Sequence, residues 1–389
     1  MLLRLVRIEQ KKWKGSFAVT DLRRIVIKIG SSSLNHPEGG LDDQAIQRIA
    51  DVISEIRKKG VECVLVSSGA VAAGVGRLGL KSKPRNLAGK QAVAAIGQGV
   101  LIEKYDLALQ ARGLISAQVL LSRIDLAEAS RYRNAQNTLE QLLRYGVVPI
   151  INENDTVAVE ELCFGDNDRL SAMVAGLVHC DLLVILTDVD GLYSANPKSD
   201  PNAFLIEEVK DLNEVMDVAG GAGSSLGTGG MITKLKAAEI ATRFGIPMFL
   251  LHSKRIMDIL QLLEGKGKRP MGTYFAPASH RIMGKKRWIA YAGLSEGSIF
   301  IDQGAVDALL RGKSLLASGV IGVEGVWERK ELVRINGPDG VEVARGLVEL
   351  SSGELVKVRG KQSSEMLELI PDLEGEEVVH RDHMTMMLE

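Results

Sequence analysis

Short apolar runs alternate with longer amphipathic segments over residues 22–275. Each run is bounded by turn residues and rich in Val, Ile or Leu, which predicts buried strands at 22–29, 61–66, 146–151, 181–186 and 246–251. Isoleucines at helical spacing predict a helix over 42–59, and the segments 234–244 and 256–263 also suit helices. Strands that alternate with helices predict an α/β fold, a three-layer αβα sandwich around a mainly parallel sheet.

The pattern changes after this region. Residues 264–286 lose periodicity and gather Gly, Pro and Lys, so we expect a linker at 276–286 after a first domain at 21–275. Short alternating runs such as VEVA (341–344) and VKVR (356–359), split by charged turns, predict a small β-rich domain at 287–363.

Both ends of the chain are strongly charged. Residues 1–20 carry a net charge of +4, and we treat them as a basic N-terminal extension that precedes the first domain. Residues 364–389 carry a net charge of −7, and we expect an acidic tail that packs loosely or lies exposed.

Composition narrows the class of protein. A formal net charge of −1 over 389 residues excludes a globally basic nucleic-acid binder and an acidic disordered chain. Aromatic residues make up 4%, too few for broad base-stacking surfaces. Three cysteines without a CxxC pair indicate a reducing, cytoplasmic compartment. No signal-peptide apolar region and no uncharged apolar stretch near 18 residues is present, so we expect no membrane span.

The candidate chemistry lies where strands end, since ligands of parallel sheets bind beyond the carboxyl ends of the strands. Lys28 stands in VIKIGSS, where a buried ammonium group needs a partner. It either faces phosphate beside the Gly30 turn or extends along the strand to water. The run VSSGAVAAG (66–74) leads into a second helix whose N-terminus attracts anions, although Ser and Gly are common in any such turn.

Three more polar segments follow later strands. INEND (151–155) and GDND (165–168) suit the ammonium and polar end of an amino acid, a divalent cation, or simple turns and helix caps. The glycines of GTGGMITK (227–234) allow close approach to phosphates beside Lys234, or form a flexible loop. GVGRLG (74–79) matches a dinucleotide-binding motif but does not follow a strand directly, so we reject a dinucleotide site there. His380 and His383 lack a third metal ligand nearby, so we assign no metal site to them.

Taken in order, these segments resemble the glutamate 5-kinase (gamma-glutamyl kinase) family of the amino acid kinase superfamily. The resemblance covers about residues 22–360 and includes VIKIGSS, VSSGAVAAG, AGKQAVAAIGQ (88–98), NAQNTL (134–139), VVPIINEND (147–155), GDND, LTDVDGLY (186–193) and GTGGMITK. The stretches RWIAYAG (287–293) and GKSLLASGVIGVEG (312–325) are similar to a PUA domain. Asn196 before Pro197 and Trp327 depart from the family pattern.

The resemblance implies ATP-dependent phosphorylation of the γ-carboxylate of L-glutamate, which begins proline synthesis. The family's catalytic lysines fall on Lys28 and Lys234, and the aspartate that organises them falls on Asp168. Its glutamate-binding positions fall on Ser68, Asp155 and Asn167. Its nucleotide-binding positions fall on Lys28, Thr187, Asp188, Thr228, Gly229, Gly230, Met231, Ile232, Thr233 and Lys234.

The resemblance also implies partners. Mg²⁺ is expected mainly through the ATP phosphates, with no protein metal ligands assigned, and proline is expected as an inhibitor. A homodimer or homotetramer and channelling to γ-glutamyl phosphate reductase follow from the family. Kinases of acetylglutamate, aspartate or a nucleoside monophosphate are the first alternative. An RNA-binding protein is the second, which the modest charge of +3 over residues 281–362 disfavours.

Overall fold

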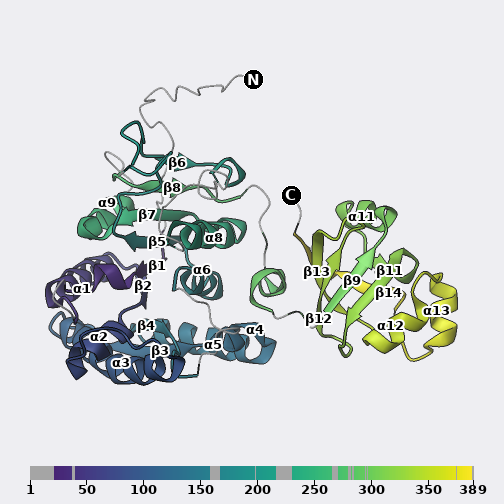
Figure 1. The fold of residues 1–389 in the computed structure, drawn as a ribbon, viewed down its shortest axis with the longest axis horizontal. Coiled ribbons are helices and arrows are strands. Elements are labelled where there is room, and N and C mark those ends of the chain that lie inside the picture. Colours follow the sequence, from purple (N-terminus) through teal and green to yellow (C-terminus); the bar gives the residue numbers. More distant parts are fainter. Residues whose placement is uncertain are drawn as a thin grey trace.

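The computed structural model describes residues 22–36, 40–157, 167–197, 199–215, 230–264, 270–278, 282, 284–293, 295, 297–373 and 375–387. These residues form two β-sheets, each with its own helices, in a first domain and a C-terminal domain (Figure 1). The basic extension over residues 1–20 lies outside the described residues.

The first domain contains an eight-stranded sheet in the order β3-β4-β2-β1-β5-β7-β8-β6. Its strands are β1 (Arg24–Ile29), β2 (Glu62–Ser67), β3 (Ser116–Leu121), β4 (Val148–Glu153), β5 (Leu182–Thr187), β6 (Glu208–Val209), β7 (Met248–His252) and β8 (Thr273–Phe275). Neighbouring strands are parallel except for the antiparallel pair β7 and β8. The carboxyl ends of β1, β2, β4 and β5 therefore meet along one edge of the sheet.

Helices cover both faces of this sheet, as the sequence predicts. One face packs on α1 (Asp43–Lys58), α3 (Leu87–Gln110) and α9 (Ile259–Glu264), and the other on α5 (Ala129–Arg144), α6 (Asn167–Leu177) and α8 (Gly230–Arg243). The shorter helices are α2 (Ala70–Leu78), α4 (Arg123–Ala127) and the 3-10 helices η1 (Ser31–Ser33) and η2 (Ser253–Asp258). The side chains of β1 alternate between the two faces, so Ile27 packs toward α1 whereas Val26 packs toward α6.

The strands predicted for the first domain are all present within a few residues, but three further strands of its sheet were not predicted. Strand β3 is half-exposed at the sheet edge, so its apolar pattern is weak. Strand β8 lies inside the segment 264–286 that lost periodicity, and Thr273, Tyr274 and Phe275 are buried there. The predicted helix at 256–263 is divided between η2 and α9.

The C-terminal domain contains a six-stranded sheet in the order β10-β14-β13-β12-β9-β11. Its elements are β9 (Gly297–Ile301), α11 (Gln303–Leu310), β10 (Leu315–Leu316), η4 (Ala317–Gly319), β11 (Val320–Gly325), β12 (Leu332–Asn336), β13 (Glu342–Val348), α12 (Ser352–Val358), α13 (Ser363–Leu369) and β14 (Glu377–Met386). Trp327 is 1% exposed in the core of this domain and donates its indole N–H to the Leu350 carbonyl at 3.1 Å.

Two expectations for this domain were wrong. The run VKVR lies mostly in helix α12, because Ser351 and Glu354 form a capping box that starts a helix there. The acidic tail is not loosely packed: β14 pairs with both β10 and β13, and Val378 and Val379 are fully buried. Its charged residues occupy the exposed positions of a strand whose other side chains join the core.

A short helical segment joins the domains. It comprises α10 (Lys285–Arg287) and η3 (Trp288–Ala292), and Trp288 and Ile289 join the core cluster on the α6 face of the first sheet. Arg345 from β13 donates to the Ala290 carbonyl at 3.0 Å, so this segment contacts both domains.

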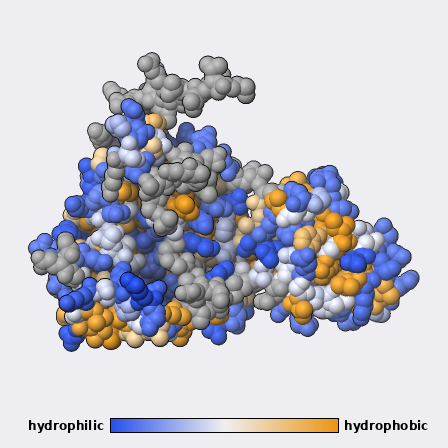
Figure 2. All heavy atoms as spheres, viewed as in Figure 1, coloured by the Kyte–Doolittle hydropathy of each residue, from blue (hydrophilic) through white to orange (hydrophobic). Residues whose placement is uncertain are grey.

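The surface is mostly hydrophilic, with hydrophobic residues gathered on the C-terminal domain and at the lower edge of the first domain (Figure 2). Exposed apolar side chains on or beside α2 and α3 include Leu78, Leu80, Leu87 and Ile96. None of the helices in the described ranges has the length and apolar character needed to cross a membrane.

Candidate active site

Lys28 lies near the carboxyl end of the central strand β1 and is 5% exposed. It shares a face of the sheet with Val26, because alternate side chains of a strand point the same way. That face is covered by α6 and α8, so the ammonium group points toward these two helices rather than to water. A side chain at Gly30 would stand 3.6 Å from Lys28 Nζ, which shows how close the ammonium group lies to the turn after β1.

Asp168 holds together the charged centre of the site. It is the second residue of α6 and is 1% exposed. One carboxylate oxygen forms an ion pair with Lys28, and the other lies 3.2 Å from the ammonium group of Lys234 on α8. Thr233 donates its hydroxyl to the same oxygen at 2.8 Å. The structure thus brings together the three residues that the resemblance implied for catalysis.

The charge state of Asp168 follows from these contacts. Burial disfavours the charged carboxylate, but the ammonium groups of Lys28 and Lys234 outweigh that effect and lower the pKa of Asp168 below its ordinary value of 3.8. Asp168 is therefore a carboxylate at neutral pH. Lys234 also donates to the Gly230 carbonyl at 2.9 Å, at the start of its own helix.

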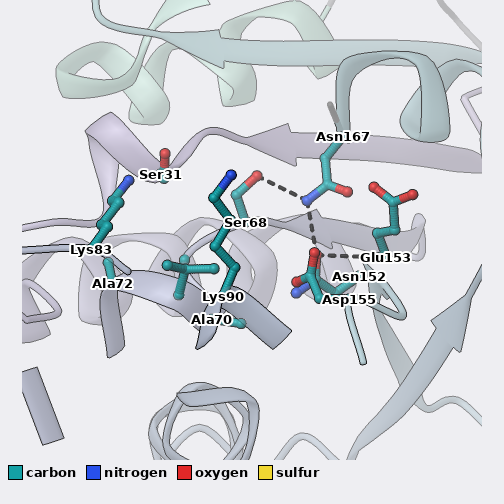
Figure 3. Close-up of a pocket in the computed structure, with 12 residues that line it drawn as sticks. Ser31, Ser68, Ala70, Ala72, Lys83, Lys90, Asn152, Glu153, Asp155 and Asn167 are labelled. Atoms are coloured by element: carbon teal, nitrogen blue, oxygen red, sulfur yellow. Dashed lines mark hydrogen bonds between the residues drawn. The ribbon is translucent and has the colours of Figure 1, made fainter. Parts of the chain in front are cut away.

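A pocket of about 300 Å³ lies beside this centre, within the range that small ligands occupy. Its lining combines polar residues from three strand ends with the first turn of α2, and comprises Ser31, Ser68, Gly69, Ala70, Val71, Ala72, Lys83, Lys90, Asn152, Glu153, Asp155 and Asn167 (Figure 3). Gly69 has φ +114°, a left-handed conformation that favours glycine, and α2 begins directly after it without a side-chain cap. The uncapped N-terminus of α2 therefore opens onto the pocket and favours an anion there.

Hydrogen bonds fix the orientation of the Asn167 amide. Its Nδ2 donates to the Asn152 Oδ1 at 2.8 Å, to the Ser68 hydroxyl at 2.9 Å and to the Ser67 carbonyl at 3.3 Å (Figure 3). The Asn152 oxygen is itself identified by the backbone N–H of Glu153, which donates to it at 2.9 Å. Asn167 Oδ1 is buried and accepts no hydrogen bond within the described part of the chain. Such an acceptor requires a donor, and an ammonium group in the pocket would supply one.

Asp155 and Glu153 add negative charge to this part of the pocket. Asp155 lies in the turn after β4, and burial raises its pKa. Glu153 is 8% exposed at the end of β4. A bound cation would offset the cost of burying these carboxylates.

The residues implied for nucleotide binding are only partly described. Thr187 and Asp188 lie at the end of β5, next to β1, and the Thr187 hydroxyl donates to Asp188 at 3.2 Å. Gly230, Met231, Ile232 and Thr233 form the first turn of α8 with Lys234. Thr228 and Gly229 lie outside the described residues, as do Gly165 and Asp166 of the GDND segment.

The sequence reasoning did not assign several residues that line the pocket or bond to its lining. Lys83 and Lys90 line the pocket from the segment between α2 and α3 and from the start of α3. Gln98 accepts a hydrogen bond from Asn152 at 2.8 Å. Lys90 and Gln98 both belong to AGKQAVAAIGQ, a segment that contributed to the family resemblance but was given no catalytic or binding role. GVGRLG lies largely within helix α2, which agrees with rejecting a dinucleotide site.

The arrangement suits one kind of chemistry. Two ammonium groups flank one buried carboxylate. They can neutralise the negative charge of a group that is transferred between strand β1 and helix α8. The adjacent pocket offers a helix N-terminus for an anion, with carboxylates and an amide oxygen for a cation. A small zwitterion with a reactive anionic end fits this distribution of charge.

Comparison with known proteins agrees with the geometry. The profile of the Amino acid kinase family matches residues 23–252, and that of the PUA domain matches residues 297–370. The chain is 81% identical over 371 residues to "Glutamate 5-kinase" of Desulfitobacterium hafniense (strain Y51), covering 95% of this chain and 100% of the relative. It is 48% identical to "Glutamate 5-kinase" of Trichlorobacter lovleyi over 94% of this chain and 97% of the relative.

Among solved structures, a carbamate kinase from Giardia lamblia bound to AMP-PNP matches with a TM-score of 0.48 at 19% identity, covering 66% of this chain and 99% of that chain. At that level the match carries no argument about activity.

Proposed function

The chain belongs to the amino acid kinase family, among the glutamate 5-kinases, and from that premise we propose that it transfers the γ-phosphoryl group of ATP to the side-chain carboxylate of L-glutamate. The product is γ-glutamyl phosphate, the first intermediate of proline synthesis. The observation that carries this proposal is Asp168, buried between Lys28 and Lys234 beside a pocket with a free amide acceptor.

The reaction needs no general base. A glutamate carboxylate has a pKa near 4.3 and is already ionised at neutral pH, so it attacks phosphorus directly. The attacking oxygen forms a bond to the γ-phosphorus while the bond to the β,γ-bridging oxygen of ATP breaks, and ADP leaves with that electron pair. The protein has to hold two anions in line and offset the charge on the transferring group.

The proposed roles follow from position. Lys28 and Lys234 offset the charge on the phosphoryl group and on the leaving phosphates. Asp168 lies between the two ammonium groups, pairs with both and so fixes the distance between them. Ser68 and the N-terminus of α2 receive a substrate carboxylate, while Asn167 Oδ1 and Asp155 receive the substrate ammonium group. Thr187, Asp188 and the segment 228–234 would contact the nucleotide.

We expect Mg²⁺ to enter with ATP. Mg²⁺ keeps several waters and binds substrate phosphates with few protein ligands. Among the described residues, the charged groups at the phosphoryl position are two cations and one carboxylate already paired with them, which fits a metal carried by the phosphates. When bound, Mg²⁺ supplies further neutralisation of phosphate charge.

The test is turnover of ATP and Mg²⁺ with L-glutamate, with hydroxylamine present to trap the acyl phosphate. Aspartate, acetylglutamate and UMP serve as parallel acceptors. We expect hydroxamate with glutamate alone. Turnover with acetylglutamate, aspartate or UMP but not with glutamate would keep the family and overturn the proposed substrate.

Three further expectations belong to this proposal. Proline carries the ammonium and α-carboxylate groups of glutamate without its side-chain carboxylate, so we expect it to inhibit by competing with glutamate. We also expect the protein to form a homodimer or homotetramer and to lie in the cytoplasm. There we expect the unstable acyl phosphate to be passed directly to γ-glutamyl phosphate reductase. Proline titration of the hydroxamate assay and measurement of the mass in solution test the first two.

A further inference from the structure

Two lysines of the pocket have no role in the proposed reaction. Lys83 and Lys90 are exposed, and both line the pocket. Neither ammonium group forms an ion pair with any residue in the described part of the chain. Among the described residues that line the pocket they are the only cations, since Lys28 and Lys234 lie beside it and are engaged by Asp168.

The position of Lys90 is electrostatically unfavourable without a ligand. It is the fourth residue of α3, close to the positive end of the helix dipole, where a cation is disfavoured. The helix is already capped by the Asn86 side chain, which accepts from the Gly89 N–H at 2.8 Å. Lys90 therefore contributes nothing to starting its helix, and an anion in the pocket would account for its placement.

The charges of the pocket are separated. In Figure 3 the ammonium group of Lys83 lies beside Ser31 and that of Lys90 beside Ser68, whereas Glu153 and Asp155 lie on the far side of Ser68 with Asn167. A ligand with both charges is thereby oriented, with its cation at Asn167 and Asp155 and an anion at the lysines.

We propose that Lys83 and Lys90 bind the α-carboxylate of the amino acid substrate and so select acceptors that carry this second anionic group. This inference rests on the proposed function. Glutamate has two carboxylates, and only the side-chain carboxylate can occupy the phosphoryl position between Lys28 and Lys234. Once the ammonium group is placed at Asn167 Oδ1, the α-carboxylate is left with the two unpaired lysines as its cations.

The test compares Lys83→Met, Lys90→Met and the double variant with the parent. Lys81→Met is the matched control, because Lys81 is exposed in the same segment but does not line the pocket. Lys90→Arg keeps the charge. Each protein is assayed with glutamate and with glutamate α-amide, which retains the reacting carboxylate and the ammonium group but has no α-carboxylate. Competition of the α-amide against glutamate gives its inhibition constant.

We expect the KM for glutamate to rise about ten-fold in each single variant, as loss of one hydrogen bond to a charged group produces. The kcat and the KM for ATP stay close to those of the parent, because both lysines act on the part of the substrate that does not react. The inhibition constant of the α-amide stays unchanged, since it lacks the group that the lysines bind. Lys90→Arg recovers most of the affinity, and Lys81→Met behaves as the parent.

A double variant with a glutamate KM within two-fold of the parent overturns the proposal. So does an equal rise for glutamate and the α-amide, which would indicate a general disturbance of the pocket. A rise in the KM for ATP alone would place the lysines at the nucleotide. Failure of the parent itself to phosphorylate glutamate would instead contradict the proposed function.

Discussion

The ion-pair centre gives the sharpest prediction, through Asp168→Asn. The substitution preserves the shape of the side chain and an oxygen for the Thr233 hydroxyl, but it removes the negative charge that both lysines face. Lys28, at 5% exposure, then loses the carboxylate with which its buried ammonium group is paired. Removing one partner of a buried ion pair costs about 3–5 kcal/mol, so we expect the free energy of unfolding at neutral pH to fall by about that amount.

Activity should fall as well. The two ammonium groups repel each other once the carboxylate between them is gone, and misplacing a key electrostatic group costs about 10²–10³ in rate. We therefore expect kcat to fall by at least about 10²-fold, with a smaller effect on the KM for glutamate. The hydroxamate assay measures both constants, and urea unfolding measures stability.

A second substitution separates the two effects. Adding Lys28→Met to Asp168→Asn removes the buried ammonium group that lost its pairing with Asp168, so most of the lost stability should return, whereas kcat should stay low because a catalytic ammonium group is gone. A kcat of the Asp168→Asn variant within three-fold of the parent would refute the role of Asp168. Failure of Lys28→Met to restore stability would refute the account based on buried charge.

The pH dependence has a definite sign. The pKa of Asp168 is lowered in the folded protein, so its contribution to stability is present above the unfolded pKa and is lost as the pH falls through the folded pKa. The Asp168→Asn variant has no such contribution to lose. The difference in unfolding free energy between parent and variant should therefore be largest at neutral pH and shrink on acidification below the ordinary aspartate range.

Three other predictions concern the scaffold and the pocket. Gly97→Ala should lower Tm by several degrees, since its Cβ would stand 1.8 Å from a backbone oxygen of α2, whereas Gly99→Ala, with nothing within 4 Å, should leave Tm unchanged or raise it. The KM for glutamate should rise as the pH falls through the raised pKa of Asp155, and Asp155→Asn should abolish that dependence; a parent KM constant with pH would contradict it. Truncation after Leu373 removes β14 from between two strands, and proteolysis should then degrade the C-terminal domain; resistance equal to that of the full chain would refute the argument.

The sequence located the charged centre but not its geometry. Lys28 stood out because an ammonium group in an apolar strand requires a partner. Asp168 and Lys234 stood out in polar and glycine-rich segments, and the resemblance gave them their catalytic roles. Their meeting depends on α6 and α8 packing on the same face of β1, across separations of 66 residues or more, which no local pattern encodes. Lys83 gave no signal, because exposed lysines are ordinary on any surface, and Lys90 lay in a segment of the resemblance that had been given no role.

The errors in the C-terminal domain have local causes. The alternation of VKVR favoured a strand, yet the capping residues Ser351 and Glu354 three positions apart were a stronger helix signal. In residues 364–389 the net charge outweighed the few apolar residues of β14, although the consecutive residues Val378 and Val379 are both fully buried there.

By itself the sequence determined the alternation of strands and helices, the division into two domains and the strand ends that carry polar residues, because these depend on local periodicity and turn chemistry. The tertiary structure alone decided which polar residues meet. Strand order places β1 between β2 and β5, and that order brings Lys28, Asp168 and Lys234 together and gathers Ser68, Asp155 and Asn167 around one pocket. Contacts between distant residues follow from the packing of whole elements, so they appear only when the sheet is assembled.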